Sequence, residues 1–359
     1  MGTLLRRMSS EMNILGLMSG TSLDGLDMAL CHFDSEHRFQ LLAATTIPYP
    51  EYWRQRLSML HRATALEYVR ADVELGHWMG MRVSEFLLER GLHADCIASH
   101  GHTVFHQPQQ GLTTQIGDPN AISAETGIAV VADFRRLDVA LGGQGAPLVP
   151  IGDRLLFADY GCCINLGGIA NISYEADGRR LAYDICPCNM ALNLLAARQG
   201  QPYDRDGAMA SAGRIDQRLL QALEALDYYR LAPPKTLGKE WFEQQMEPLL
   251  SAATPTSDLM RTVAEHIARQ LAAAIPKNCN SALVTGGGAH NTFLIDLLRQ
   301  KRTDVAITVP EAQIIDYKEA IIFALLGYLR LQGQPSCLAS VTGARRDSSA
   351  GLLCGNINL

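Results

Sequence analysis

The sequence lacks the features that mark secreted, membrane-bound and nucleic-acid-binding proteins. Its densest apolar run, residues 320–331, is too short to cross a membrane, and the first ten residues hold no apolar core of a signal peptide. A formal net charge of −6 gives no basic surface for nucleic acid or an anionic membrane. We therefore expect a cytoplasmic protein that binds neither nucleic acid nor membrane.

The sequence also lacks a cysteine pattern that would build disulfides or a zinc site. Its nine cysteines are scattered, odd in number and without a CxxC pair. Neither Cys162 with Cys163 nor Cys186 with Cys188 has zinc-ligand spacing, and neither do the three histidines within residues 100–106. We expect reduced thiols and no metal bound by the protein alone.

What the sequence has instead is glycine-rich turns between apolar runs. Residues 16–27 read GLMSGTSLDGLD between the apolar runs 13–15 and 28–31, which predicts a β-hairpin. The turn offers unobstructed backbone N–H groups, two hydroxyls and acids for the phosphates of a nucleotide and its Mg²⁺, with Asp24 near the cation. It has no Gly-Lys-Ser/Thr ending, so it is not a Walker loop. An ordinary hairpin turn is the alternative.

Two more glycine-rich turns follow in the second half of the chain. Residues 162–174 repeat the strand, glycine turn and strand, and residues 284–291 place a glycine turn between a strand and a helix at 292–299. A chain of 359 residues with 47% apolar residues suits two domains. The order of turns is typical of the α/β, two-domain actin-like ATPase (ribonuclease H-like) fold, with a cleft between the domains. We expect a first domain at 1–140, with the segment 339–359 packing back onto it, and a second at 141–338.

Residues 51–90 have a helical pattern that ends at Gly91. Apolar residues recur there at near-helical intervals and predict one buried face. This face consists of Leu57, Leu60, Leu66, Val69, Val73, Leu75, Met79, Val83, Phe86 and Leu87.

Polar residues then gather at the ends of predicted strands. The strand 96–98 leads into His100, and Gln115, Asp118 and Arg135 also lie at strand ends. At the carboxyl ends of strands in an open α/β sheet, such side chains can bind a sugar through directional hydrogen bonds. Solvated surface turns are the alternative for each of them.

Seven strings, in order, resemble the anhydro-N-acetylmuramic acid kinases from Ile14 to about Leu353. They are GLMSGTSLDGLD at 16–27, HGHTVFHQP at 100–108, QIGD at 115–118, DFRRLD at 133–138, LGGQGAPLVP at 141–150, NLGGIAN at 165–171 and GGGAHN at 286–291. The resemblance implies an ATP-dependent kinase of cell-wall peptidoglycan recycling. It would open the 1,6-anhydro ring of 1,6-anhydro-N-acetylmuramic acid with water and phosphorylate O6, giving N-acetylmuramic acid 6-phosphate.

The resemblance also assigns roles to residues. Asp184 would be the general base that takes a proton from the attacking water, and Glu319 matches an acid of the family's active site. ATP and its phosphates would be bound by Gly20, Thr21, Ser22, Leu23, Asp24, Gly25, Leu26, Asp27, Gly167, Gly168, Asn171, Gly286, Gly287, Gly288 and Asn291. The sugar would be bound by His100, Gln115, Asp118, Arg135, Gln144 and Asn189. Taken alone, Asp184 could instead cap a helix predicted at 190–198.

The chain departs from the family pattern in two places. Residues 184–189 read DICPCN where the family commonly reads DTGPGN, so Cys186 and Cys188 replace glycines, and His102 stands where Gln is expected. The cysteines could reshape the sugar pocket or mark a branch whose backbone needs no positive φ there, and the intact motifs elsewhere favour the second interpretation. Two functional alternatives remain: a kinase of another 1,6-anhydrosugar such as levoglucosan, and a catalytically inactive sensor of cell-wall sugars. A homodimer is left open.

Overall fold

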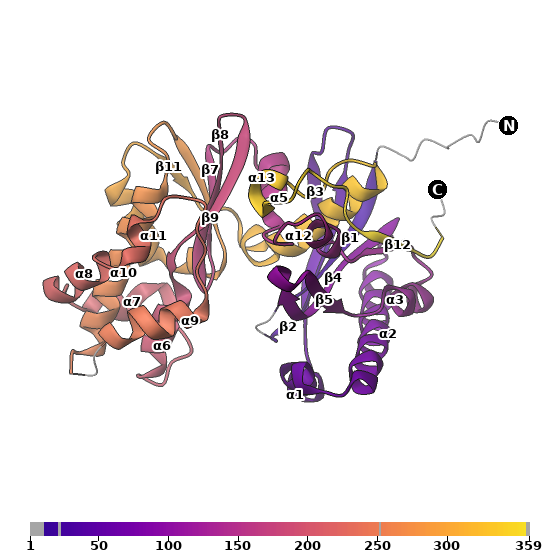
Figure 1. Ribbon diagram of the computed structural model, residues 1–359, viewed down its shortest axis with the longest axis horizontal. Coiled ribbons are helices and arrows are strands. Elements are labelled where there is room, and N and C mark those ends of the chain that lie inside the picture. Colours follow the sequence, from indigo (N-terminus) through magenta and orange to yellow (C-terminus); the bar gives the residue numbers. More distant parts are fainter. Residues whose placement is uncertain (1–10, 21–22, 251–252, 357–359) are drawn as a thin grey trace. The chain divides into compact units, whose positions relative to one another are not determined.

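The computed structural model describes residues 11–20, 23–250 and 253–356 of the chain. The chain divides into two compact units (Figure 1). Unit 1 consists of Met1–Leu156 and Tyr317–Leu359, and unit 2 consists of Phe157–Asp316.

Unit 1 is built on a sheet whose strands follow the order β12-β6-β4-β1-β2-β3. β1, β2 and β3 form an antiparallel meander, and β4 and β6 run parallel to β1 and to each other. β5 pairs with β4 beside this path, and β12 closes the edge antiparallel to β6. The strands are β1 (Met12–Ser19), β2 (Gly25–Phe33), β3 (Phe39–Pro48), β4 (Cys96–Gln107), β5 (Leu112–Ile116), β6 (Val130–Ala132) and β12 (Leu352–Cys354).

Unit 2 repeats this plan with a five-stranded sheet in the order β11-β10-β7-β8-β9. β7, β8 and β9 are the antiparallel meander, and β10 and β11 add in parallel beside β7. The strands are β7 (Cys162–Leu166), β8 (Ile169–Ala176), β9 (Arg179–Pro187), β10 (Ser281–Thr285) and β11 (Ala306–Thr308). Each unit therefore has three antiparallel strands followed by two parallel ones in the same order, and the predicted α/β fold of two actin-like domains is confirmed.

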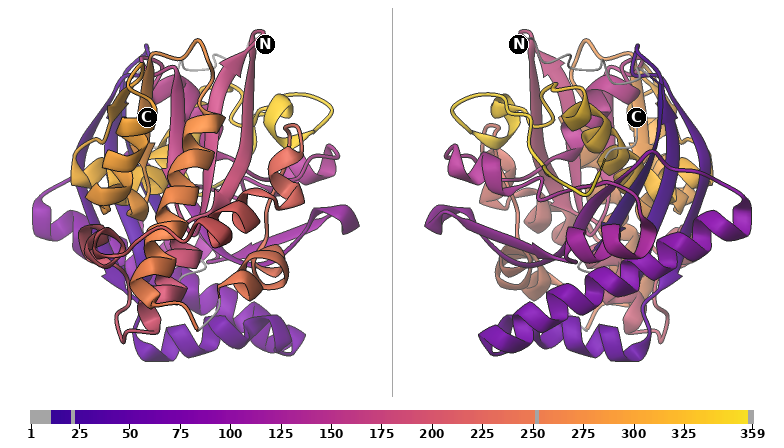
Figure 2. Two further views of the ribbon diagram at one scale, coloured as in Figure 1. Left: turned by 90° about the vertical axis from the view of Figure 1, so that its left-hand side faces the viewer. Right: turned by 90° about the vertical axis from the view of Figure 1, so that its right-hand side faces the viewer.

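The helices of unit 1 cover both faces of its sheet. The long α2, purple in Figure 2, packs beside α3, and residues of both helices join the core above β1 and β4. On the other face α12 comes so close that a Cβ at Gly327 would lie 2.6 Å from the Cβ of Ala98. The helices are α1 (Glu51–Met59), η1 (Leu60–Arg62), α2 (Ala65–Arg90), η2 (Pro108–Gln110), α3 (Pro119–Thr126), α4 (Arg136–Ala140), α5 (Val149–Leu156), α12 (Ala312–Leu331) and α13 (Ala339–Thr342).

The helices of unit 2 gather around α10, whose Val263, Ile267 and Leu271 are buried in the main core of the unit. α6, α7, α8 and α11 all pack against it. The helices are α6 (Asn189–Ala197), η3 (Arg205–Gly207), α7 (Ala208–Ala212), α8 (Gln217–Glu224), η4 (Asp227–Arg230), α9 (Lys239–Trp241), η5 (Phe242–Met246), η6 (Glu247–Leu249), α10 (Thr256–Ala274), η7 (Gly287–His290) and α11 (Thr292–Lys301).

The ends of the units lie at 156/157 and 316/317, whereas the sequence placed domain boundaries at 140/141 and 338/339. The contacts between α5 and α12 account for the difference. Lys318 Nζ on α12 lies 2.7 Å from Asp153 Oδ1 on α5, and Gly152 leaves room for Ile322. Because α12 packs on the first sheet and α5 packs on α12, residues 141–156 and 317–338 belong to unit 1.

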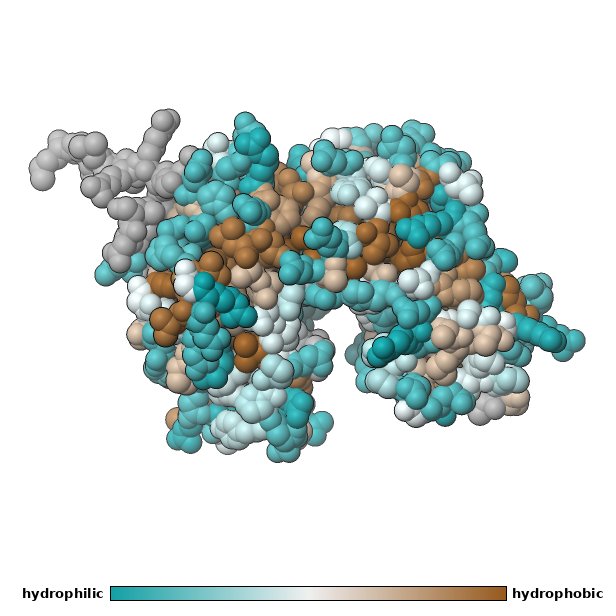
Figure 3. All heavy atoms as spheres, turned by 180° about the vertical axis from the view of Figure 1, so that it is seen from behind, coloured by the Kyte–Doolittle hydropathy of each residue, from teal (hydrophilic) through white to brown (hydrophobic). Residues whose placement is uncertain are grey.

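The predicted buried face of residues 51–90 is only partly correct. Leu57, Leu75 and Met79 are buried, but Leu66 and Val69 are 69% and 57% exposed, and Val73 is exposed as well. Small residues of α2 face the core in their place, since Ala71, Gly76 and Gly80 are buried. Isolated apolar residues on a surface are ordinary. Figure 3 shows one face of the molecule, where apolar residues gather into patches between polar ones. Within the described ranges, no helix is long and apolar enough to cross a membrane.

Candidate active site

The first glycine-rich turn joins β1 to β2 as the sequence predicts. Leu23 adopts φ 61°, which is rare for a branched apolar residue, and its N–H donates to the carbonyl of Gly20. Gly25 has to be glycine, because a Cβ there would lie 2.4 Å from the carbonyl oxygen of Ile47. Asp24 is exposed and is thus available to a ligand, whereas Leu26 is buried in the core. Thr21 and Ser22, which were also predicted to bind phosphate, lie outside the described residues.

A buried hydrogen-bond chain supports the end of β1, next to this turn. The Tyr49 hydroxyl donates to Ser19 Oγ at 2.8 Å, and Ser19 Oγ lies 2.9 Å from Nδ1 of His102. Burial lowers the pKa of His102 to about 4. The ring is therefore neutral near pH 7, with Nδ1 free to accept the proton of the Ser19 hydroxyl.

His100 and Arg135 form a second buried pair in unit 1. His100 Nδ1 lies 2.8 Å from the carbonyl oxygen of Gly101, and Arg135 Nε donates to His100 Nε2 at 3.0 Å. A carbonyl only accepts and a guanidinium only donates, so the proton of the neutral ring is on Nδ1. Burial and the charge of Arg135 lower the pKa of His100 well below its usual value. The pair therefore stays as neutral imidazole and cationic guanidinium at physiological pH.

Arg135 is in turn linked to the loop at residues 142–147. Its Nη1 donates to the carbonyl of Gly145 at 2.7 Å, and the N–H of Gly145 donates to Asp138 Oδ2 at 2.7 Å. The other oxygen of Asp138 accepts from Thr342 Oγ1 at 2.8 Å and from Cys337 Sγ at 3.1 Å. Residues 133–138 therefore contain both Arg135, which is predicted to bind the sugar, and Asp138. The buried carboxylate of Asp138 fixes the loop that carries Gln144.

Glu319 lies on α12 within the electrostatic reach of Arg135 and of Asp27 on β2. The surrounding protein raises its pKa by removing it from bulk water, and the Asp27 carboxylate adds to this effect, while Arg135 and Lys318 oppose it. Its side chain still reaches solvent. Unit 1 thus brings the predicted acid Glu319 close to the predicted sugar-binding Arg135.

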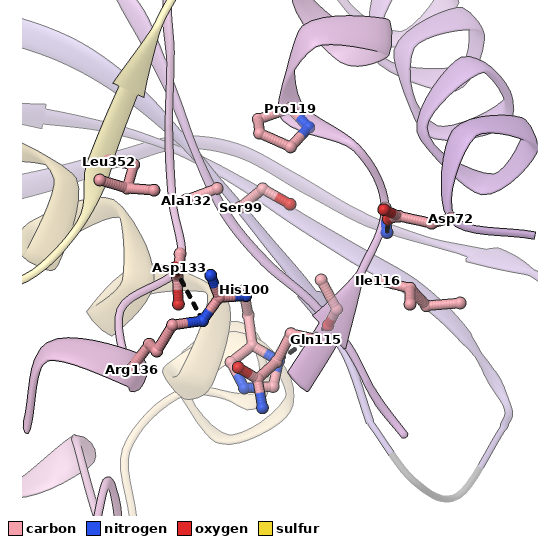
Figure 4. A pocket seen from close by; sticks show the side chains of 12 residues that line it. Asp72, Ser99, His100, Gln115, Ile116, Pro119, Ala132, Asp133, Arg136 and Leu352 are labelled. Carbon is pink, nitrogen blue, oxygen red and sulfur yellow. Dashed lines mark hydrogen bonds and ion pairs between the residues drawn. The ribbon is translucent and has the colours of Figure 1, made fainter. Parts of the chain in front are cut away.

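Gln115 and His100 line a cavity of about 170 Å³ in unit 1 (Figure 4). Its floor is the row Ser99, Ala132 and Leu352, which are neighbours across β4, β6 and β12. The ion pair between Asp133 Oδ2 and Arg136 Nε, 3.4 Å apart, stands at its rim. Small-molecule pockets are usually about 300–1,000 Å³, so this cavity has room for part of an amino sugar only.

Asp118 has a structural role that was not predicted for it. Its Oδ1 accepts from the backbone N–H of Asn120 and caps the first turn of α3.

Gln115 donates its amide to Thr113 Oγ1 at 2.9 Å, and its other hydrogen bond, to Thr103 Oγ1, is longer at 3.3 Å.

In unit 2 the second and third glycine turns lie against one another. A Cβ at Gly286, whose φ is 80°, would lie 2.5 Å from Asn165 Oδ1, and one at Gly288 would lie 2.9 Å from Asn189 Oδ1. Asn189 Nδ2 donates to the carbonyl of Leu166 at 2.9 Å. Gly287 is exposed. Asn291, which was predicted to bind ATP, caps α11 by accepting from the N–H of Leu294.

The second turn is hydrogen-bonded to the start of α6. The carbonyl of Gly168 accepts from the N–H groups of Cys188 and Met190, and the carbonyl of Gly167 accepts from the N–H of Asn189. The first amides of a helix otherwise lack intrahelical partners and attract anions. Here those amides are satisfied by the turn.

Three polar side chains form a row across the meander of unit 2. Asn165 on β7 pairs with Asn171 on β8, and Asn171 pairs with Asp184 on β9. Directly opposed residues on neighbouring strands share a face of the sheet, so the predicted base lies beside two amides. The sequence did not single out Asn165, although it directly precedes the second glycine turn.

Asp184 lies inside β9, which rules out the alternative interpretation that it caps a helix. α6 begins after Cys188, and Asp184 Oδ2 instead accepts from Thr236 Oγ1 and from the N–H of Leu237, both at 2.8 Å. Desolvation by burial raises the pKa of Asp184, and these two hydrogen bonds oppose the shift. The sequence did not single out Thr236, because nothing local in it links residues that are 52 positions apart.

Comparison with known proteins decides the family. The family model described as anhydro-N-acetylmuramic acid kinase matches residues 12–355. The anhydro-N-acetylmuramic acid kinase of Shewanella sp. (strain MR-7) is 39% identical, with 94% of this chain and 97% of that protein covered. That of Vibrio vulnificus (strain YJ016) is 38% identical, with 96% and 99% covered. The chain belongs to the anhydro-N-acetylmuramic acid kinase family.

Among solved structures, this family member is similar to component A of the (R)-2-hydroxyglutaryl-CoA dehydratase of Acidaminococcus fermentans. The identity is 12% and the TM-score 0.47, with 88% of this chain and 98% of that chain covered.

Cys186 and Cys188 of this family member do not need the positive φ that glycine allows. Both are fully buried, and neither is among the described residues whose φ is positive. The interpretation that the backbone needs no positive φ at these two positions is therefore confirmed. Cys188 has φ −121° and ψ −98°, which lies outside the main α and β regions, so its backbone is unusual for a residue with a side chain.

Proposed function

We propose that this protein is the ATP-dependent kinase that opens the anhydro ring of 1,6-anhydro-N-acetylmuramic acid with water and phosphorylates O6, giving N-acetylmuramic acid 6-phosphate. Family membership over nearly the whole chain supports the reaction, and the setting of Asp184 is the observation that supports its mechanism. A cytoplasmic location follows from a role in recycling.

Asp184 has the properties that a general base for the attacking water needs. Oδ2 accepts the two hydrogen bonds from Thr236 and Leu237, and Oδ1 takes part in neither. When water attacks the anomeric carbon, Oδ1 would take its proton, while O6 leaves and attacks the γ-phosphorus. Partial burial raises the pKa of Asp184 toward the operating pH, which favours proton transfer.

ATP would be bound by the glycine turns of the two units, with Mg²⁺ brought by the nucleotide. In the described part of the chain no three or more His, Cys, Asp or Glu side chains gather into a metal site. Mg²⁺ in kinases is commonly held by one or two carboxylates together with substrate phosphates. The exposed carboxylate of Asp24 beside the first turn fits that arrangement. The Mg²⁺ would neutralise charge on the transferred phosphoryl group.

The sugar would be recognised through His100, Gln115, Arg135, Gln144 and Asn189. Arg135 is a cation whose Nε and Nη1 are already engaged with His100 and Gly145, so its position is fixed before a ligand binds. A fixed guanidinium suits the lactyl carboxylate of the proposed substrate, which levoglucosan lacks.

The test compares wild type with Asp184→Asn, using ATP with either 1,6-anhydro-N-acetylmuramic acid or levoglucosan. The Asn side-chain oxygen can still accept from Thr236 and Leu237, but the base is gone, so kcat should fall by about 10²–10⁴-fold or more. ATP binding should change little. Exposed Asp177→Asn in the β8–β9 turn is the matched control and should keep wild-type kcat.

The outcomes separate the alternatives. Near-normal kcat for Asp184→Asn would remove Asp184 as the base. Faster turnover of levoglucosan by wild type would replace the substrate, and tight sugar binding without ATP consumption would indicate a sensor instead of an enzyme.

A further inference from the structure

The segment that follows η4, residues 231–238, lies beside Asp184 of β9. We propose that Thr236 in this segment is a positioning residue for Asp184, because its hydroxyl fixes Oδ2 and thereby leaves Oδ1 as the oxygen that meets the water. This inference rests on the proposed function, in which Asp184 is the base.

The segment holds Asp184 through both its backbone and its side chain. The N–H of Asp184 donates to the carbonyl of Lys235 at 3.1 Å, and its carbonyl accepts from the Tyr228 hydroxyl at 2.5 Å. Thr236 Oγ1 and the N–H of Leu237 then converge on Oδ2, each at 2.8 Å. Three hydrogen bonds with the segment and one from Tyr228 of η4 therefore fix both the position and the rotation of Asp184.

β9 alone would hold Asp184 less firmly. Among the described strands β9 is the edge strand of its sheet, so only β8 pairs with it there. The register between β8 and β9 also shifts beside Asp184, since Asn171 pairs with Asp184 while Ala170 pairs with Cys186, which makes Ile185 a bulge. A bulge redirects the adjacent side chains, and the segment at 235–237 supplies the constraint that the edge lacks.

The segment is itself anchored to the core of unit 2. Lys235 Nζ donates to the carbonyl of Tyr228 at 3.2 Å and lies 4.5 Å from the centre of its ring. The ring of Tyr228 packs against Trp241 at 5.5 Å, and the neighbouring Tyr229 packs against the buried His266 of α10 at 4.9 Å. Leu237 is also buried. The donors to Asp184 are thus held on a fixed support.

Thr236 can be changed without touching the core, because its side chain is exposed. Thr236→Val keeps the branched shape and removes the hydroxyl, and Thr236→Ser keeps the hydroxyl. A hydrogen bond donated to a carboxylate favours its charged form. Its loss should raise the pKa of Asp184, and a base with a raised pKa is ionised only at higher pH.

The experiment measures kcat and KM for the anhydrosugar between pH 5 and pH 9. For Thr236→Val we expect the fall of kcat/KM on the acid side of its pH profile to move to higher pH. We also expect kcat near pH 6 to fall about tenfold and the KM for ATP to be unchanged. Thr236→Ser should restore the wild-type profile. A merely structural role would lower activity without moving the acid side of the profile.

Two results would overturn the inference. In one, the pH profile of Thr236→Val coincides with that of wild type. In the other, Thr236→Ser behaves like Thr236→Val, so that the hydroxyl is irrelevant. Failure of the proposed function is seen separately, because Asp184→Asn would then keep its activity whatever Thr236 does.

Discussion

The two units share one strand order but differ in what occupies their first hairpin turn. In unit 1, five residues (20–24) join β1 to β2, and they bring a positive-φ leucine and an exposed acid. In unit 2, the two glycines 167 and 168 join β7 to β8, and their carbonyls receive the amides at the start of α6. A repeated fold therefore does not give a repeated binding site. The first turn presents an exposed carboxylate, whereas the carbonyls of the second turn are hydrogen-bonded to the start of α6.

The units also fix their reactive side chains differently. In unit 1 the polar groups are buried: His100, His102 and Asp138 are 5%, 4% and 1% exposed and bonded within the core. In unit 2, Asp184 is only half-buried and is fixed by a segment about 50 residues further along the chain. Burial lowers the pKa of His100 and of His102 and keeps both rings neutral in unit 1, and hydrogen bonds from residues 236 and 237 give Asp184 a defined orientation in unit 2.

The largest effect expected from this comparison is on the acid stability of unit 1. The pKa of His102 is about 4 when folded and about 6.5 when unfolded. Below pH 6.5 the unfolded chain binds more protons at His102 than the folded chain does. The contribution of His102 to the free energy of unfolding is therefore fully present above pH 6.5 and is lost as the pH falls toward 4. In the variant His102→Gln, the new side chain can still accept a hydrogen bond from Ser19, but it does not titrate. Relative to His102→Gln, wild type should lose about 2 kcal/mol between pH 8 and pH 5.

Urea unfolding at the two pH values measures this loss. His61→Gln, at an exposed position, should stay within about 0.5 kcal/mol of wild type at both. An equal pH dependence in wild type and His102→Gln would show that burial of His102 does not set its protonation state.

A smaller effect should separate the glycine turns of unit 2. Gly286→Ala would place a Cβ 2.9 Å from the Leu166 backbone at φ 80°, and should cost about 1–2 kcal/mol and raise the KM for ATP. At Gly168 a Cβ would meet nothing closer than 3.9 Å, so Gly168→Ala should cost no more than about 0.5 kcal/mol. Thermal unfolding and ATP kinetics of both variants measure the difference. Equal costs would contradict the proposed close contact of the third turn.

Local chemistry explains what could be predicted from the sequence. Each hairpin follows from glycines between apolar runs, and Gly91 ends α2 with φ 60°. Helical periodicity could not tell which apolar residues of α2 face the core, because the glycines that permit close packing with α3 carry no hydropathy signal. Leu66 and Val69 were therefore misplaced.

Contacts between distant parts of the chain explain what could not be predicted. α12 belongs to the first unit from Tyr317 onward, so the unit boundaries differ from those expected from the sequence. Thr236 reaches Asp184 across 52 positions, and Thr342 reaches Asp138 across 204. The candidate residues were found through family motifs, and their partners became visible only in the folded chain.

The most direct test of the mechanism runs the wild-type reaction with ATP and 1,6-anhydro-N-acetylmuramic acid in ¹⁸O-enriched water, quenches it early and analyses the product by mass spectrometry. If water attacks the anomeric carbon, as the proposed role of Asp184 requires, the C1–O6 bond breaks, the label enters the sugar at C1, and O6 and the phosphoryl group carry no ¹⁸O. Label at O6 with none at C1 would mean that water attacks C6 and breaks the C6–O bond instead, and it would contradict the account.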